Sequence, residues 1–140
     1  MHIDSRTGIL YLNMSISDSS IHDYSDLVFR VLPGSSVATA IIGLRFGDPG
    51  NITTDSQGRV IVSMTHGVGV YCANPWRRCR FLAFDSQPQA LAYDPTYDHL
   101  YVRSAVNQEV LIYDYSTGKQ VGGFNPGFDL RSMIVSPVLP

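Results

Sequence analysis

The sequence predicts an all-β protein assembled from repeated units of about four short antiparallel strands. Its composition indicates strands and tight turns rather than long charged helices: aromatic residues make up 11% of the 140 residues and charged residues 16%, with 12 Gly and 8 Pro. One pattern, an Asp followed by a short turn and a run of β-branched and aromatic residues, also occurs three times along the chain. We therefore expect almost no helix.

The three copies of this pattern read IDSRTGILYL, TDSQGRVIVS and YDPTYDHLYV, at residues 3–12, 54–63 and 93–102. Their aspartates, Asp4, Asp55 and Asp94, are 51 and 39 residues apart, close to the roughly 40 to 50 residues of a four-stranded propeller blade. An Asp at the start of a turn accepts a hydrogen bond from the backbone two residues on, and Gly8 and Gly58 can adopt the positive φ that closes a tight hairpin. The repeat therefore predicts an Asp-initiated hairpin at the start of each unit.

Two further extended segments follow this hairpin in each copy, so the chain divides into units at about residues 1–48, 49–87 and 88–130. Residues 131–140 repeat the opening of a unit and are expected to form the first strand of a further blade. The chain is thus predicted to be a single partial propeller of about three four-stranded antiparallel blades. A β-sandwich, or hairpins that are alike by coincidence, would also give short strands, but neither is expected to show this ordered repeat.

The third unit carries the most specific motifs. They are Leu100-Tyr101-Val102, then Val110-Leu111-Ile112-Tyr113-Asp114, then Thr117-Gly118-Lys119, in which Gly118 is expected to close a turn. This unit resembles the repeats of the NHL and YVTN families of β-propellers. The resemblance implies a propeller fold and implies much less about function.

Propellers typically close into rings of about four to eight blades, and closure removes exposed strand edges. Three units do not close a ring. The chain is therefore expected to be part of a longer propeller, or else to form a homodimer in which two copies join edge to edge. In both cases we expect self-association through blade edges, because the terminal blades leave strand edges and apolar faces uncovered.

Charge and hydropathy exclude some partners. The formal net charge of −2 and the isoelectric point of about 6.0 give no overall attraction to nucleic acid or to anionic lipid. No apolar run approaches the roughly 18 residues of a membrane-spanning helix, so no membrane span is predicted. The composition does not indicate a cellular compartment.

Two cysteines, Cys72 and Cys79, flank the segment ANPWRR, which is expected to be a hairpin loop. They form a disulfide if the hairpin places them opposite each other, and otherwise are partly buried free thiols; the sequence favours neither. Two Cys are too few for a structural zinc site, and the four histidines show no metal-ligand spacing. No metal site, cofactor or catalytic residue is predicted.

The segment NPWRRCR, residues 74–80, is the main candidate for a binding surface. Trp76 is expected at the tip of the hairpin, beside Arg77, Arg78 and Arg80. Trp and Arg dominate binding hot spots because they combine apolar area with directed donors, so an anionic peptide, glycan or lipid head group could bind there. The alternative is that Trp76 packs on the neighbouring unit while the arginines face solvent.

The sequence as a whole predicts a non-enzymatic scaffold that binds a protein or a small ligand through loops held on a rigid frame. One alternative is a propeller-type enzyme, such as a metal-dependent lactonase or lyase, whose site needs the complete ring. Another is a structural subunit that builds a larger assembly through its blade edges.

Overall fold

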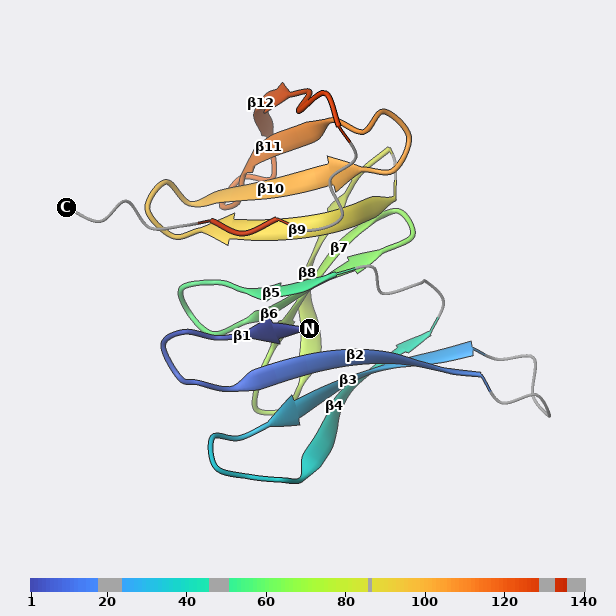
Figure 1. Ribbon diagram of the computed structural model, residues 1–140, viewed down its shortest axis with the longest axis vertical. Coiled ribbons are helices and arrows are strands. Elements are labelled where there is room, and N and C mark those ends of the chain that lie inside the picture. The colour runs from blue at the N-terminus through green and yellow to red at the C-terminus, as the bar shows by residue number, and fades with distance from the viewer. Residues whose placement is uncertain (18–23, 46–50, 86, 129–132, 136–140) are drawn as a thin grey trace.

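The computed structural model describes residues 1–17, 24–45, 51–85, 87–128 and 133–135, and these residues contain twelve strands and no helix. The strands form three four-stranded sheets in which all pairings between neighbours are antiparallel (Figure 1). The predicted all-β fold class is therefore confirmed.

The sheets follow one another along the chain. The first contains β1 (His2–Ile3), β2 (Leu10–Ser17), β3 (Tyr24–Val31) and β4 (Ala38–Arg45). The second contains β5 (Ile52–Thr54), β6 (Val60–Met64), β7 (Gly67–Cys72) and β8 (Arg77–Ala83). The third contains β9 (Pro88–Asp94), β10 (His99–Ser104), β11 (Val110–Asp114) and β12 (Gln120–Phe124). In each sheet the order of strands in space is their order in the sequence, so each sheet is a meander.

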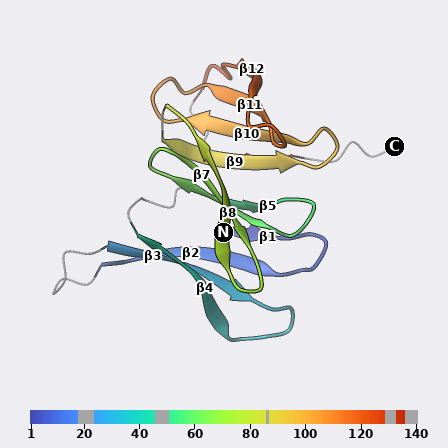
Figure 2. The ribbon, with the colours of Figure 1, turned by 180° about the vertical axis from the view of Figure 1, so that it is seen from behind.

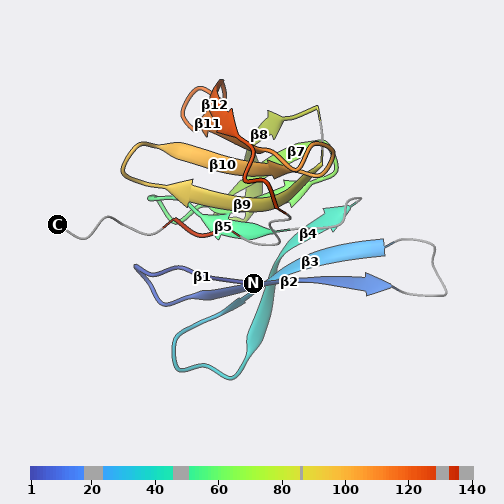
Figure 3. The ribbon, with the colours of Figure 1, turned by 45° about the horizontal axis from the view of Figure 1, so that its top comes forward.

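The sheets are stacked with their first strands next to one another. β1 contacts β5, and β5 contacts β9. Figure 3 shows β5 lying between β9 and β1. The first strand of each sheet therefore lies toward a common region of the molecule.

Strands β5, β6 and β7 of the second sheet are buried on both faces, whereas most residues of β8 are exposed. Val60 and Val62 of β6 face the first sheet, whereas Ile61 between them faces the third, because successive side chains of a strand point to opposite faces. All three side chains are fully buried. A strand that is buried on both sides needs no polar residue on either face, which explains why β6 begins with the uninterrupted run Val-Ile-Val.

Two apolar cores result from this stacking. The core between the first and second sheets consists of Tyr11, Val28, Ile42, Ile52, Val60, Val62 and Tyr71. The core between the second and third sheets consists of Ile61, Val68, Val70, Leu82, Phe84, Leu91, Leu100, Val102, Tyr113 and Tyr115. Burying one such aliphatic or aromatic side chain contributes about 1.5 to 3 kcal/mol, so these cores are the main force that holds the sheets together.

The segment expected to begin a further unit does not form a strand where it is described. Met133, Ile134 and Val135 have no strand assignment, because no neighbouring strand pairs with them. They lie over the outer face of the third sheet and line a groove of about 360 Å³ together with Ala92, Tyr101, Val110 and Phe124. The remainder of 131–140 lies outside the described residues, and self-association through this face stays a prediction.

Candidate functional site

The same Asp-initiated turn opens each sheet. Asp4, Asp55 and Asp94 are buried, with 3%, 2% and 7% of their surfaces exposed. The side chain of each accepts a hydrogen bond from the backbone N–H two residues on, which satisfies a turn donor that has no strand partner. The three donors are the N–H groups of Arg6, Gln57 and Thr96, at 3.0, 2.9 and 2.8 Å.

A residue in the left-handed conformation closes each turn. Gly8 and Gly58 have φ values of 69° and 78°, and Asp98 takes the corresponding place in the third turn with a φ of 53°. Gly118, with a φ of 75°, closes the turn between β11 and β12. Gly adopts this conformation without the steric cost that a Cβ adds, and Asp is one of the few other residues that adopt it. The residue at this position therefore fits the conformation in each of the four turns.

Side chains join the three opening turns into one surface, at residues 4–9, 55–59 and 94–98, which we call the turn face. The guanidinium of Arg6 donates to the carbonyl oxygen of Ser56, and the Ser56 hydroxyl lies 3.4 Å from the Tyr93 hydroxyl. Tyr93 in turn donates to Asp98 at 2.8 Å. Figure 1 shows the three turns projecting from the same side of the molecule.

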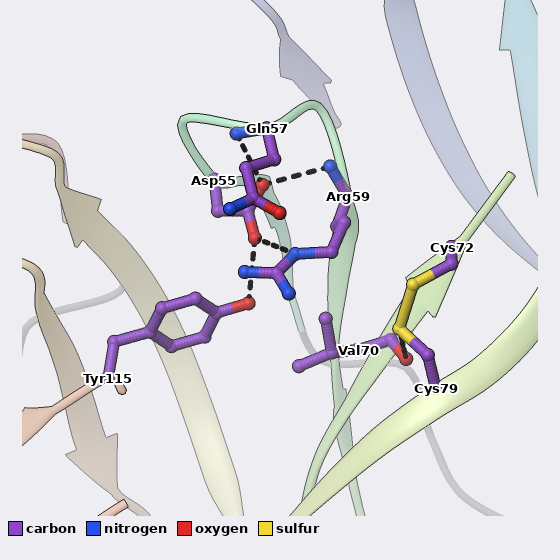
Figure 4. The surroundings of a disulfide bond; sticks show 7 residues. All are labelled: Asp55, Gln57, Arg59, Val70, Cys72, Cys79 and Tyr115. Atoms are coloured by element: carbon purple, nitrogen blue, oxygen red, sulfur yellow. Dashed lines mark hydrogen bonds and ion pairs between the residues drawn. A yellow bond between two sulfur atoms is a disulfide. The ribbon is translucent and has the colours of Figure 1, made fainter. Parts of the chain in front are cut away.

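A buried polar network centred on Asp55 lies behind the turn face. One oxygen of Asp55 accepts from the Arg59 N–H at 2.9 Å, and the other pairs with Arg59 Nε at 2.5 Å. The same second oxygen accepts from the hydroxyl of Tyr115 at 2.9 Å, although Tyr115 lies in the turn that follows β11 of the third sheet (Figure 4). Burial, followed by the charge of Asp55, raises the pKa of Tyr115, so the phenol remains a proton donor to the carboxylate.

Two cations flank the ring of Tyr115. The guanidinium carbons of Arg59 and Arg80 each lie 5.6 Å from the ring centre, and Arg80 also donates to the Tyr115 carbonyl oxygen. The Tyr93 ring meets it edge-on, with 5.1 Å between centroids. Because Arg59 and Arg80 belong to the second sheet, these contacts join the second and third sheets through charged and aromatic groups as well as through the apolar core.

The four candidate binding residues of the β7–β8 hairpin lie in different environments. Trp76 is half-buried and packs against the core between the first and second sheets; Figure 2 shows the β7–β8 hairpin extending alongside the first sheet. Arg80 faces Tyr115 in the third sheet. Only Arg77 and Arg78 are exposed, with Arg78 5.3 Å from the ring centre of Phe81. Packing thus uses Trp76 and Arg80, and the structure does not bring the four residues together on one exposed surface.

Cys72 and Cys79 form a disulfide across this hairpin. The Cα atoms are 5.8 Å apart and the sulfurs 2.12 Å apart. The Cα separation lies within the range that a disulfide requires, although Cys72 pairs in the ladder with Arg77 and not with Cys79. Of the two alternatives that the sequence left open, the structure has the disulfide.

Two exposed side chains of the turn face were not identified from the sequence. Tyr97 is 67% exposed at the third turn, and the side chain of Arg6 is 45% exposed at the first. The signal that could have identified them is positional, since both follow an Asp of the recurring turn within three residues. Tyr and Arg are among the residue types that are enriched in binding hot spots.

The described residues do not form a metal site or a membrane-spanning helix. In that part of the chain, no group of three or more His, Cys, Asp or Glu is arranged to hold a metal ion. The same residues include no helix with the length and apolar character needed to span a membrane. Comparison with protein-family models found no match, and neither did comparison with curated proteins.

The turn between β11 and β12 gives a prediction about acid stability. Hydrogen bonds from the hydroxyl and N–H of Thr117, and from the Ser116 hydroxyl, lower the pKa of Asp114 from 3.8 to about 2. The ionised carboxylate therefore stabilises the fold above the unfolded value of 3.8, and this contribution is lost as the pH falls through about 2. We expect Asp114→Asn to lower the melting temperature at about pH 6, and we expect the difference from the unsubstituted protein to vanish near pH 2. An equal difference at both pH values would contradict the assignment.

Proposed function

We propose that the three sheets are consecutive blades of a β-propeller and that the protein is a non-enzymatic scaffold that binds a protein or a small ligand through its turn face. The observation that carries this proposal is the linked series of opening turns. Each turn starts at a buried Asp, and side chains connect the first turn to the second and the second to the third. Repetition of one unit with side-chain links between neighbours is typical of repeat proteins that present a continuous surface.

The stacking of the sheets supports the propeller interpretation. Four-stranded meanders stacked face to face, with their first strands adjacent, are the arrangement of successive propeller blades. A sandwich would bury one face of each of two sheets, whereas here strand β6 of the middle sheet contributes side chains to apolar cores on both of its faces. The spacing of the opening aspartates along the chain supports the same interpretation.

The turn face has the properties of a recognition surface. Its backbone is held by buried aspartates, so binding there requires little ordering of the chain. Its exposed groups include the ring of Tyr97, the guanidinium of Arg6 and the amide of Gln57. An aromatic anchor surrounded by directed donors is a common composition for a protein-binding hot spot.

Selection from a display library of random peptides would test this proposal. We expect the peptides selected on the immobilised protein to lose at least about tenfold in affinity for a Tyr97→Ala variant, because truncating an aromatic hot spot typically costs about 2 kcal/mol or more. Val106→Ala is the matched control, since Val106 is also exposed in the third sheet but lies in the turn between β10 and β11, at the other end of β10.

Two results would contradict the turn-face assignment. One is a set of selected peptides that bind the Tyr97→Ala and Gln57→Ala variants as tightly as the unsubstituted protein. The other is a loss of binding in Val106→Ala equal to that in Tyr97→Ala. All three variants replace exposed side chains, so none is expected to disturb folding.

A further inference from the structure

Cys79 has no cross-strand partner in the β7–β8 hairpin. Tyr71 pairs with Arg78 and Val70 pairs with Arg80, so Cys79 faces no residue of β7 and is the extra residue of a β-bulge. Its disulfide partner, Cys72, pairs with Arg77 at the last rung before the turn. The disulfide therefore ties the bulged residue to the end of the opposite strand.

The bulge determines which face of the sheet Arg80 occupies. With the bulge, Arg80 lies on the same face as Val70, toward the third sheet, and reaches the carbonyl oxygen of Tyr115. In a hairpin with the same turn and no bulge, every residue after position 78 would move by one register, and each side chain would change face. Arg80 would then point away from Tyr115. The contact between the second and third sheets thus depends on the feature that the disulfide holds in place.

The two ends of the disulfide differ in exposure. Cys79 is exposed, whereas Cys72 is half-buried. Residues 72–84 contain three Arg and no Asp or Glu, and neighbouring cations favour the thiolate form of a cysteine. A departing Cys72 thiolate would therefore form beside Arg77, its cross-strand partner. Low pKa of the leaving thiol speeds thiol–disulfide exchange.

We propose that Cys79 is a thiol-exchange site and that opening the disulfide there loosens the contact between the second and third sheets. The thiolate of a low-molecular-weight thiol attacks Cys79 Sγ, the bond to Cys72 Sγ breaks, and Cys72 leaves as a thiolate. A second small thiol attacks the sulfur of the first in the mixed disulfide and releases the Cys79 thiolate. The two protein thiolates take up the two protons that the small thiols lost, so the protein disulfide gains two electrons and one small-molecule disulfide forms.

Exchange with reduced glutathione tests the site. The oxidised protein would be incubated with glutathione, quenched in acid and analysed by peptide mass mapping. We expect the early glutathione adduct on Cys79 to exceed that on Cys72 by about tenfold, because Cys79 is the more exposed of the two residues. An adduct found mainly on Cys72, or a disulfide that reacts only after unfolding in denaturant, would overturn the proposal.

A matched pair of charge variants tests the role of the arginines. Arg77→Gln is expected to slow adduct formation by about threefold, since it removes the cation paired with the leaving sulfur. Lys119→Gln removes one exposed cation from a different hairpin and is expected to leave the rate unchanged. Equal slowing in both variants would show that overall charge, and not the position of Arg77, controls the reaction.

Hydrogen exchange tests the structural consequence. In the Cys72→Ser, Cys79→Ser double variant and in the reduced protein, we expect faster amide exchange in β8 and around Tyr115, with no change in β2 and β3 of the first sheet. Circular dichroism would first establish that both samples retain their strands. Identical exchange around Tyr115 with and without the disulfide would overturn the coupling between the bulge and the third sheet.

Discussion

Replacing Asp55 with Ala lowers the free energy of unfolding by about 3 kcal/mol, whereas replacing Asp94 with Ala lowers it by about 1 kcal/mol. Both residues are buried and both initiate the same type of turn. The difference arises because Asp55 also accepts from Arg59 and from Tyr115. Its removal leaves a cation and a buried hydroxyl without their acceptor, while removal of Asp94 breaks one turn hydrogen bond.

The expected size of the Asp55 effect follows from the burial of the groups left behind. Removing one partner of a fully buried ion pair costs about 3 to 5 kcal/mol. The side chain of Arg59 is 30% exposed, so solvent recovers part of its hydration and the cost falls to the lower end of that range. Urea unfolding of the three proteins measures the difference, provided that the slopes of the transitions agree. Equal losses for the two Asp variants would show that the contacts of Asp55 with its neighbours add nothing to its role in the turn.

A double-mutant cycle of Asp55→Ala and Tyr115→Phe separates the energy of the hydrogen bond between these two residues from the energy that Asp55 contributes to its own turn. Tyr115→Phe removes only the hydroxyl that donates to Asp55. If that hydrogen bond stabilises the joint between the second and third sheets, the two substitutions together cost about 1 kcal/mol less than the sum of their separate effects. Additive effects would show that the hydrogen bond between Asp55 and Tyr115 contributes nothing to the stability of the fold.

Local features of the sequence were sufficient to predict the all-β class and the Asp-initiated turns of this fold. An Asp side chain that bonds two residues on, and a Gly that adopts positive φ, act within one turn, so their positions mark hairpins directly in the sequence. The all-β class followed from the same signals together with the composition. The assignment of those units to propeller blades remains a proposal, because it concerns how whole sheets are arranged.

The contacts between sheets could not be predicted in the same way. Asp55 and Tyr115 are 60 residues apart, and no local pattern connects a phenol in one hairpin to a carboxylate in another. The surroundings of the β7–β8 hairpin, which contains Trp76, could not be predicted from local sequence either. Its residue types indicate binding, but the bulge at Cys79 directs Arg80 to the third sheet, and packing on the first sheet half-buries Trp76. A bulge shifts the register by one residue without a consistent sequence signal, so the faces of β8 could not be assigned from the pattern alone.

Replacing Gly67 with Ala is the second substitution that we expect to lower the free energy of unfolding by a large amount. A Cβ at this position would lie 2.2 Å from the carbonyl oxygen of Leu82 and 2.7 Å from Cζ of Phe81. Rotation of the Phe81 ring, which is 43% exposed, can relieve the second contact. The first contact is with backbone, so relieving it requires movement of β7 relative to β8, which would disturb Leu82 in the core between the second and third sheets. Overpacking of this kind costs about 3 kcal/mol.

Gly34→Ala is the matched control for Gly67→Ala. Gly34 has a φ of 75°, and a Cβ there would meet no atom within 4 Å. Its substitution therefore costs only the strain of a left-handed residue, about 1 kcal/mol. Thermal and urea unfolding of the two variants give the comparison. If both lose the same stability, the close approach of β7 and β8 at Gly67 is not what requires glycine. A larger loss in Gly67→Ala is the result expected if the contact between the added Cβ and the backbone of Leu82 is the main cost.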